Sequence, residues 1–244
     1  MHRFLMISNR LRFTAGVPMT VGSFGDGASL REARTSSLLT ACDLAEVRLD
    51  LLAAGGLEPD RRLWRHLDGF PLLFTARRRE EGGGLESTAD ERLAWLETAL
   101  DDAAAVDLEV ASLPECGAFT KRLRELDIPL VASFHRFATT PTETELLEQL
   151  ELARAAGATV FKVAAMVNSV ADLAVLAAFQ EKDHGFPTST MGMGPLAPVS
   201  RLLCAQLGSV LNYGYIGETP TAPGQWSAAQ LSTAIHASTM VGSK

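Results

Sequence analysis

The sequence predicts an α/β protein that folds as a single (β/α)8 barrel domain over residues 1–244. Eight apolar or β-branched runs alternate with segments whose apolar residues recur at helical spacing. Each run is followed by a helix or by room for one, and the length of 244 residues is close to the ~250 residues typical of such barrels. No linker, repeat or low-complexity tract divides the chain. An open, doubly wound sheet is the weaker alternative.

The predicted elements follow from period, capping and turn residues. Thr142 and Glu145 form a capping box at the start of the clearest helix, and Gly157 marks its end. Residues 4–7 and 10–13 predict a short β-hairpin within an N-terminal segment, 1–17, that covers the end of the barrel opposite the active site. The predicted strands are residues 19–24, 45–52, 71–76, 105–110, 128–134, 158–167, 188–193 and 210–216. The predicted helices are residues 88–103, 119–127, 142–156, 170–180, 199–207 and 227–240.

Composition excludes several classes of protein. The net charge of -7 gives no basic excess for nucleic acid, and 47% hydrophobic residues suffice for a full core. The three cysteines are odd in number and contain no CxxC, which favours a reducing compartment. No stretch reaches ~18 uninterrupted apolar residues, and the N-terminal residues lack the apolar core of a signal peptide. We therefore expect a cytoplasmic protein with no membrane association.

Lys162 is the most informative single residue. The chain has four lysines against eighteen arginines, yet Lys162 stands inside the apolar run 158–167. Desolvation disfavours a buried ammonium, and an amine whose pKa is lowered can form a Schiff base with a carbonyl substrate. The alternative is a structural lysine that reaches solvent or pairs with an acid.

Polar residues also stand on the other predicted strands. Glu46, Arg48 and Asp50 are two apart and should share one face of the second strand, either as a buried ion-pair network or as a polar rim for a hydroxylated substrate. His135 follows the fifth strand, one strand before Lys162. Neighbouring strands would bring this imidazole, a possible proton shuttle, close to the amine.

Along nearly its whole length the chain resembles the type I 3-dehydroquinate dehydratases, the Schiff-base lyases of the shikimate pathway. No single motif decides this, but their order and spacing together are specific. The matching segments are Glu46-Val-Arg-Leu-Asp50, Phe74-Thr-Ala-Arg77 with Glu81-Gly-Gly83, Val106-Asp-Leu-Glu109, Ser133-Phe-His135 with Thr140-Pro141, Phe161-Lys162, Met191-Gly-Met193, Ser200-Arg201 and Ala222-Pro-Gly-Gln225.

The resemblance implies a role for each matching residue. Lys162 would form the Schiff base with 3-dehydroquinate, His135 would be the general acid/base, and Glu81 would orient that histidine. Arg201, Thr221 and Gln225 would bind the substrate carboxylate. The residues expected to hold the substrate hydroxyls and organise the pocket are Glu46, Arg48 and Arg77. Ser23, near the end of the first strand, is expected to contact the substrate as well. No cofactor or metal is implied, no metal-ligand spacing or nucleotide motif is present in the sequence, and a homodimer is expected.

Two residues depart from the family pattern: Thr221 stands where serine is usual, and Arg136 follows His135 where aspartate is usual. The threonine keeps a hydroxyl. Arg136 would either lower the pKa of the histidine or face outward. Two other functions remain as alternatives: an aldolase-type Schiff-base barrel, which shares the lysine, and a non-catalytic binding barrel, which need not keep the amine, the imidazole and the carboxylate together.

Overall fold

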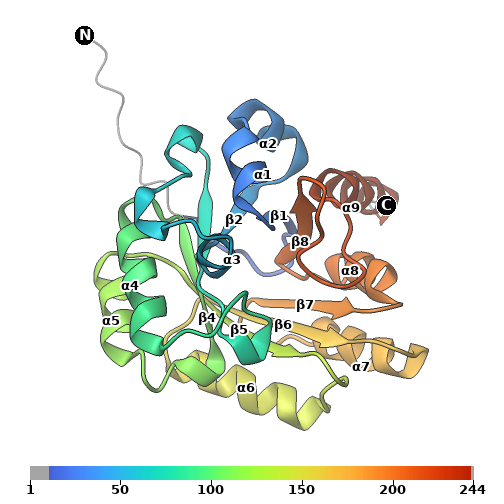
Figure 1. Ribbon diagram of the computed structural model, residues 1–244. Helices are drawn as coiled ribbons and strands as arrows, with labels where there is room; N and C mark the ends of the chain where they lie inside the picture. The colour runs from blue at the N-terminus through green and yellow to red at the C-terminus, as the bar shows by residue number, and fades with distance from the viewer. Residues whose placement is uncertain (1–10, 243–244) are drawn as a thin grey trace.

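The computed structural model describes residues 11–242, in which eight parallel strands form a nearly closed barrel surrounded by helices (Figure 1). The strands neighbour one another in the order β7-β6-β5-β4-β3-β2-β1-β8. Between β7 and β8 the link is sparser: the Val210 N–H donates to the Thr188 carbonyl at 3.0 Å, and the Ser189 hydroxyl donates to the Leu211 carbonyl. The predicted barrel is confirmed.

The elements alternate along the chain as predicted. The strands are β1 (Met19–Phe24), β2 (Leu44–Arg48), β3 (Leu72–Thr75), β4 (Ala105–Glu109), β5 (Leu130–Arg136), β6 (Val160–Met166), β7 (Thr188–Met193) and β8 (Leu211–Ile216). The α-helices are α1 (Gly27–Glu32), α2 (Thr35–Ala41), α3 (Leu49–Ala54), α4 (Ala89–Ala99), α5 (Gly117–Glu125), α6 (Glu143–Ala155), α7 (Val170–Glu181), α8 (Ala197–Gln206) and α9 (Ala228–Gly242). Short 3-10 turns are η1 (Pro59–Arg61), η2 (Arg65–Leu67), η3 (Arg79–Glu81), η4 (Leu100–Asp102) and η5 (Val110–Ser112).

One predicted strand is wrong at its carboxyl end. The sequence predicts a strand through residue 52, but β2 ends at Arg48 and helix α3 begins at Leu49. Asp50 therefore lies in the first turn of α3 and does not share a strand face with Glu46 and Arg48. A short apolar run cannot be assigned to strand or helix by periodicity alone, which is why the boundary was missed.

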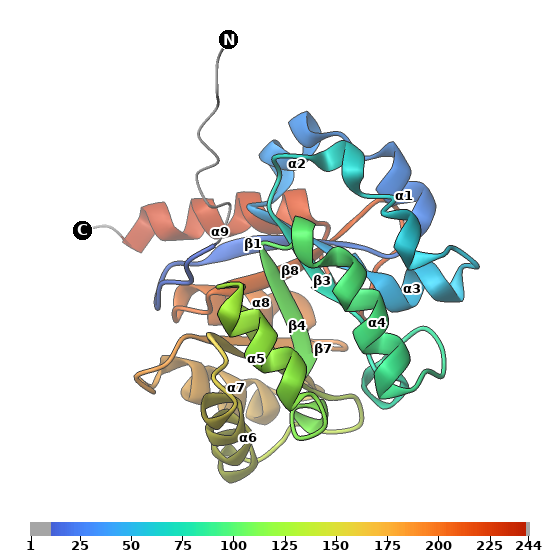
Figure 2. The ribbon, with the colours of Figure 1, turned by 90° about the vertical axis from the view of Figure 1, so that its left-hand side faces the viewer.

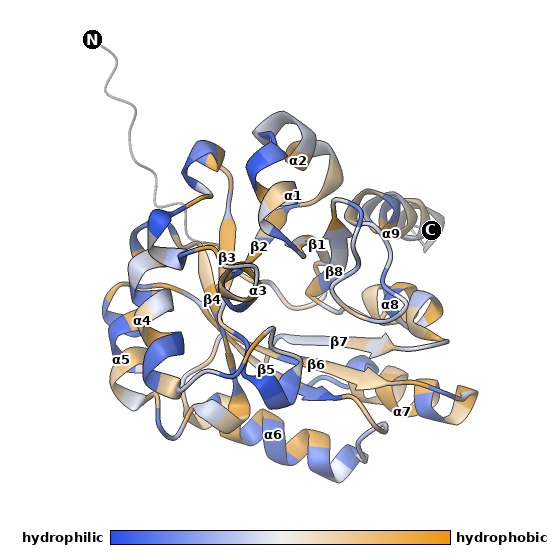
Figure 3. Cartoon of the chain, in the orientation of Figure 1, coloured by the Kyte–Doolittle hydropathy of each residue, from blue (hydrophilic) through white to orange (hydrophobic). Residues whose placement is uncertain are grey.

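Alternation along the strands divides the apolar side chains into two layers. Phe161 and Val163 of β6 belong to a cluster between the strands and the helices, whereas Val160 belongs to a second cluster inside the barrel. In Figure 3, β3 and β6 at the centre are mainly hydrophobic, β7 is close to neutral, and the surrounding helices mix hydrophobic and hydrophilic residues. The outward rows of the strands therefore hold the helices in place.

The inward rows change character along each strand. Near the amino ends they carry Leu44, Ala105, Val131 and Val160, which pack together in the interior cluster. Two residues further on, the same rows carry Glu46, Asp107, Ser133 and Lys162, all buried. Because the strands are parallel, these polar side chains gather at one end, where barrel enzymes build their active sites.

The predicted N-terminal hairpin lies mostly outside the described residues, because its first strand and the start of its second fall within residues 1–10. Leu11 and Phe13 are described without a strand assignment, and both pack against the interior cluster of the barrel. At the other end of the chain, α9 packs beside β1 and β8 (Figure 2). Within residues 11–242, no helix is long and apolar enough to cross a membrane.

Candidate active site

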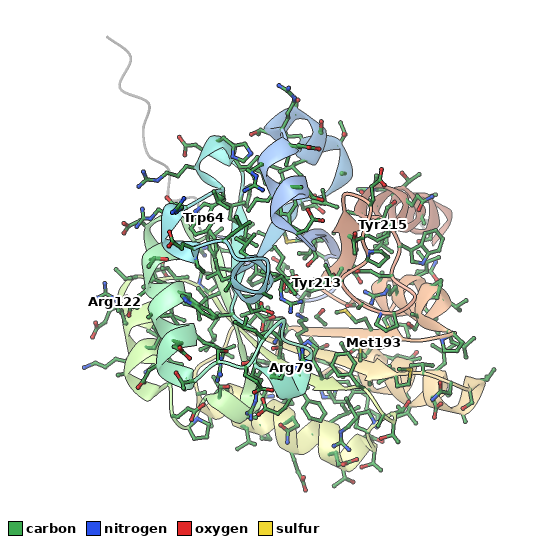
Figure 4. All side chains as sticks on the ribbon, in the orientation of Figure 1. Trp64, Arg79, Arg122, Met193, Tyr213 and Tyr215 are labelled. Atoms are coloured by element: carbon green, nitrogen blue, oxygen red, sulfur yellow. The ribbon has the colours of Figure 1, made fainter. Side chains whose placement is uncertain are left out.

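A cavity at the carboxyl end of the barrel collects nearly all the predicted site residues. It encloses about 480 Å³, including space open to solvent. Figure 4 shows Tyr213 near the centre of the barrel and Met193 close by on β7, and both residues line the cavity. The predicted site residues that line it are Glu46, Arg48, Arg77, Glu81, His135, Lys162, Arg201, Thr221 and Gln225.

Lys162 is buried in the inward row of β6, with 3% of its surface exposed. Its Nζ donates to Asp107 Oδ2 at 2.9 Å and lies 4.1 Å from the centre of the Tyr213 ring. Burial lowers the pKa of Lys162, and the Arg77 guanidinium adds to this, whereas Asp107 opposes it. The lysine thus pairs with an acid, as in the structural alternative, but it also faces the cavity with a depressed pKa.

His135 and Glu81 form a hydrogen-bonded pair. Glu81 Oε2 accepts from the backbone N–H of His135 at 3.0 Å and lies 2.9 Å from its Nδ1. A carboxylate acceptor at Nδ1 places the ring proton there and leaves Nε2 with a free lone pair. Burial lowers the pKa of His135 well below its usual value, and the Arg77 and Lys162 charges act in the same direction. Burial raises the pKa of Glu81 to about 7.

Arg77 connects β3 with β4 and β5. Its Nη1 contacts Asp107 and Glu109, each at 3.0 Å, and donates to the Ser133 hydroxyl at 2.6 Å. Burial opposes ionisation of Asp107, yet Arg77 and Lys162 hold the pKa of this carboxyl well below its usual range. Asp107 therefore stays ionised beside Arg77 and orients the Lys162 amine.

Glu46 is held by two hydroxyls. Its carboxylate accepts from Ser23 and, at 2.8 Å, from Thr75. Ser23 is fully buried and is not among the residues that line the cavity, so its contact with substrate stays a prediction. Its hydroxyl lies behind Glu46, and it can also act on a ligand through that carboxylate.

Arg201 differs from the other buried basic residues among the described residues, because no carboxylate lies beside it. It reaches the cavity from α8, where Nη1 donates to the Tyr213 carbonyl at 2.7 Å and contacts the Met191 sulfur at 3.4 Å. Its Nε has no hydrogen-bond partner in the described structure. Burial lowers the pKa of Arg201 to about 10. A buried guanidinium without a counter-ion favours an anionic ligand.

Comparison with known proteins places this architecture in a family. The family model for type I 3-dehydroquinase matches residues 26–241. The chain belongs to this family. It is 32% identical over 221 residues to the 3-dehydroquinate dehydratase of Methanothrix thermoacetophila, covering 90% of this chain and 91% of the relative. It is 34% identical over 204 residues to that of Haloquadratum walsbyi, covering 79% and 83%. Membership identifies the protein as a hydro-lyase.

Solved structures agree with the family assignment. The crystal structure of 3-dehydroquinate dehydratase from Geobacillus kaustophilus HTA426 superposes with a TM-score of 0.79 at 27% identity, covering 93% of each chain. A type I 3-dehydroquinate dehydratase from Clostridium difficile gives a TM-score of 0.78 at 20% identity, covering 96% of this chain and all of the other, which supports the fold.

The two departures from the family pattern have different positions. Thr221 lies in the loop after β8, where its N–H and its hydroxyl donate to Gln225 Oε1 at 2.8 and 2.9 Å. The threonine thus provides a hydroxyl donor, as serine would. Arg136 faces away from the cavity: its Nη2 contacts Glu145 at 3.0 Å, and its guanidinium lies over the Phe134 ring. The charges that shift the pKa of His135 most are those of Arg77 and Lys162.

Several cavity residues were not predicted as site residues. Met191, Met193 and Tyr213 line the cavity from inward positions of β7 and β8, and Phe137 lines it beside Gly82. Alternation along β7 and β8 would have placed the first three inside the barrel. It could not separate them from core residues, because apolar side chains also fill the barrel interior.

Proposed function

We propose that the protein is a 3-dehydroquinate dehydratase that eliminates water from 3-dehydroquinate through a Schiff base on Lys162, giving 3-dehydroshikimate. The observation that carries the proposal is a buried amine of lowered pKa that shares one cavity with an oriented imidazole and an unpaired guanidinium. The identity of the substrate is inferred from the family, and the mechanism is inferred from the residues that line the cavity.

The first step forms the imine. The neutral Lys162 amine attacks the substrate ketone, and the carbinolamine then takes up one proton from solvent and loses one water, which leaves a protonated imine. The lowered pKa favours the nucleophilic amine. Asp107, whose Oδ2 lies 2.9 Å from Nζ, accepts a hydrogen bond from the amine and orients it.

The second step removes a proton from the carbon beside the imine. His135 Nε2 accepts it, because Glu81 holds the Nδ1–H and the lowered pKa keeps the ring neutral before reaction. The electrons move into the imine and form an enamine. As they return, the hydroxyl leaves and takes the proton from His135 as water. Hydrolysis of the product imine then releases Lys162.

The remaining side chains bind the substrate. Arg201 offers donors without a counter-ion and suits the carboxylate, and Gln225 can add its amide N–H because its Oε1 already accepts from Thr221. Glu46 and Arg48 are placed to hold the hydroxyls. The ring of the substrate would then lie between this carboxylate clamp and Lys162.

The test is an assay of the purified protein with 3-dehydroquinate, in which the product is followed by absorbance of its conjugated enone. We expect turnover for the wild type and for Lys182→Ala, whose amine is half-exposed and pairs with Glu143. Lys162→Ala should have no turnover. No enone from the wild type, or wild-type turnover in Lys162→Ala, contradicts the proposal.

We also propose a cytoplasmic homodimer. Cys42, Cys116 and Cys204 are buried free thiols, which suits a reducing compartment. The dimer follows from the family resemblance alone. Light scattering during size-exclusion chromatography should give twice the mass of the 26.1 kDa chain, and a monomer at assay concentration would contradict it.

A further inference from the structure

Asp50, which has no part in the proposed chemical steps, is the most heavily hydrogen-bonded carboxylate beside the cavity. It is fully buried in the first turn of α3. Oδ1 accepts from Arg48 Nε at 2.9 Å and from the Arg77 N–H at 3.2 Å. Oδ2 accepts from Arg48 Nη2 at 2.7 Å and from the Gly84 N–H at 2.9 Å. Each oxygen therefore serves one side-chain donor and one backbone donor.

The two backbone donors are the ends of one loop, residues 77–84. Asp50 holds the loop at Arg77 and at Gly84, and Arg48 Nη2 donates to the Gly82 carbonyl at 3.1 Å between them. Gly82 has φ of +87°, a left-handed conformation that glycine adopts without steric cost. The residue before it is Glu81.

The loop leads from Asp50 to the proposed general base. Glu81 emerges from the segment that the Asp50–Arg48 pair holds, and its Oε2 contacts both the backbone N–H and Nδ1 of His135. A shift of the loop would move the acceptor away from the imidazole. Misplacement of about 1 Å near a reacting group can slow a reaction on the order of a hundredfold.

We infer that Asp50 is a positioning residue for the general base: it fixes the loop that carries Glu81 and acts on His135 through that carboxylate. This inference rests on the proposed function. It gives Asp50 a different role from Arg48, because the guanidinium of Arg48 lines the cavity and is proposed to bind the substrate directly.

The test combines Asp50→Asn with His135→Ala in a double-mutant cycle. Whichever way the asparagine amide is turned, its N–H2 group faces two donors, so one loop contact and one Arg48 contact are lost together. Asp50→Glu keeps a carboxylate opposite Arg48 but moves it by the length of one methylene group. This variant replaces Asp50→Asn in the test if the Asp50→Asn protein does not fold. The matched control is Asp102→Asn, since Asp102 accepts from Trp64 Nε1 at 2.8 Å away from the cavity.

We expect Asp50→Asn to lower kcat at least about 100-fold, as loss of general acid/base catalysis does, while borohydride still traps the imine. In the His135→Ala background the same change should lower kcat less than about threefold, because the residue through which it acts is gone. Asp102→Asn should leave kcat and trapping unchanged.

Three results would overturn the inference: a kcat close to wild type, an equal loss in both backgrounds, or loss of imine trapping together with turnover. The last would show that Asp50 serves substrate binding through Arg48. Failure of the proposed function is distinguishable from these, because the wild type itself would then form no enone or no adduct on Lys162.

Discussion

Replacing Arg201 with lysine should weaken substrate binding although the charge is kept. Arg201 is buried on α8, and one of its nitrogens, Nη1, is occupied by the Tyr213 carbonyl and the Met191 sulfur. The rest of the planar guanidinium remains for a carboxylate. A lysine ammonium is a compact charge without the planar, forked arrangement of donors that a guanidinium has. It cannot donate hydrogen bonds to the Tyr213 carbonyl and to two carboxylate oxygens in the same geometry.

The size of the effect follows from the donors lost. A hydrogen bond to a charged group contributes about 1.5 to 3 kcal/mol. Loss of one donor to the carboxylate therefore predicts a fall in apparent affinity of roughly tenfold to a hundredfold. Gln225→Ala acts on the same carboxylate, so the two substitutions should combine non-additively.

The assay is a double-mutant cycle on kcat/KM, with turnover followed by enone absorbance. Arg92→Lys is the matched control, because Arg92 is a buried arginine that donates to the Ser87 carbonyl outside the cavity. It should leave kcat/KM unchanged. An unchanged constant for Arg201→Lys, or strict additivity with Gln225→Ala, would show that the carboxylate is bound elsewhere.

Three further predictions concern other residues of the cavity. His135→Ala should lower kcat by about 10² to 10⁴-fold while borohydride still traps the imine, and near-normal turnover would exclude His135 as the base. Glu81 must be ionised to accept the Nδ1–H, and burial raises its pKa to about 7, so kcat should fall as the pH drops through about 7. A pH profile of Glu81→Gln that keeps this limb would refute the assignment. Tyr213→Phe removes a buried hydroxyl without a partner in the described structure and should raise the free energy of unfolding by about 1 kcal/mol in urea titrations; a decrease would contradict this.

The barrel and its inward polar row could be predicted from the sequence because both depend on local periodicity. Strand alternation places Lys162 between Val160 and Ala164 on the inward face, and this placement depends only on the local sequence. The position of His135 follows from the same rule one strand earlier. These predictions need only the order of the strands and the parallel direction that βα units impose.

Predictions that depend on contacts between distant residues could not be made in the same way. Asp107 pairs with Lys162 across 55 positions of sequence, and no spacing signals such a pair. The direction of Arg136 was left open because it depends on Glu145, in the first turn of α6. Asp50 was placed on a strand because the short run 45–52 does not distinguish strand from helix by its period, and its contacts with Arg77 and Gly84 come from another βα unit and leave no signal in the local sequence.

The most direct test of the account is the site of covalent attachment. Borohydride added with 3-dehydroquinate should trap a reduced adduct on Lys162, because hydride reduces an imine but not a free amine, and mass spectrometry of the digested protein should locate it there. Lys162→Ala should take up no label. An adduct on Lys121, Lys182 or Lys244 of the wild type, or labelling that persists in Lys162→Ala, would contradict the central claim.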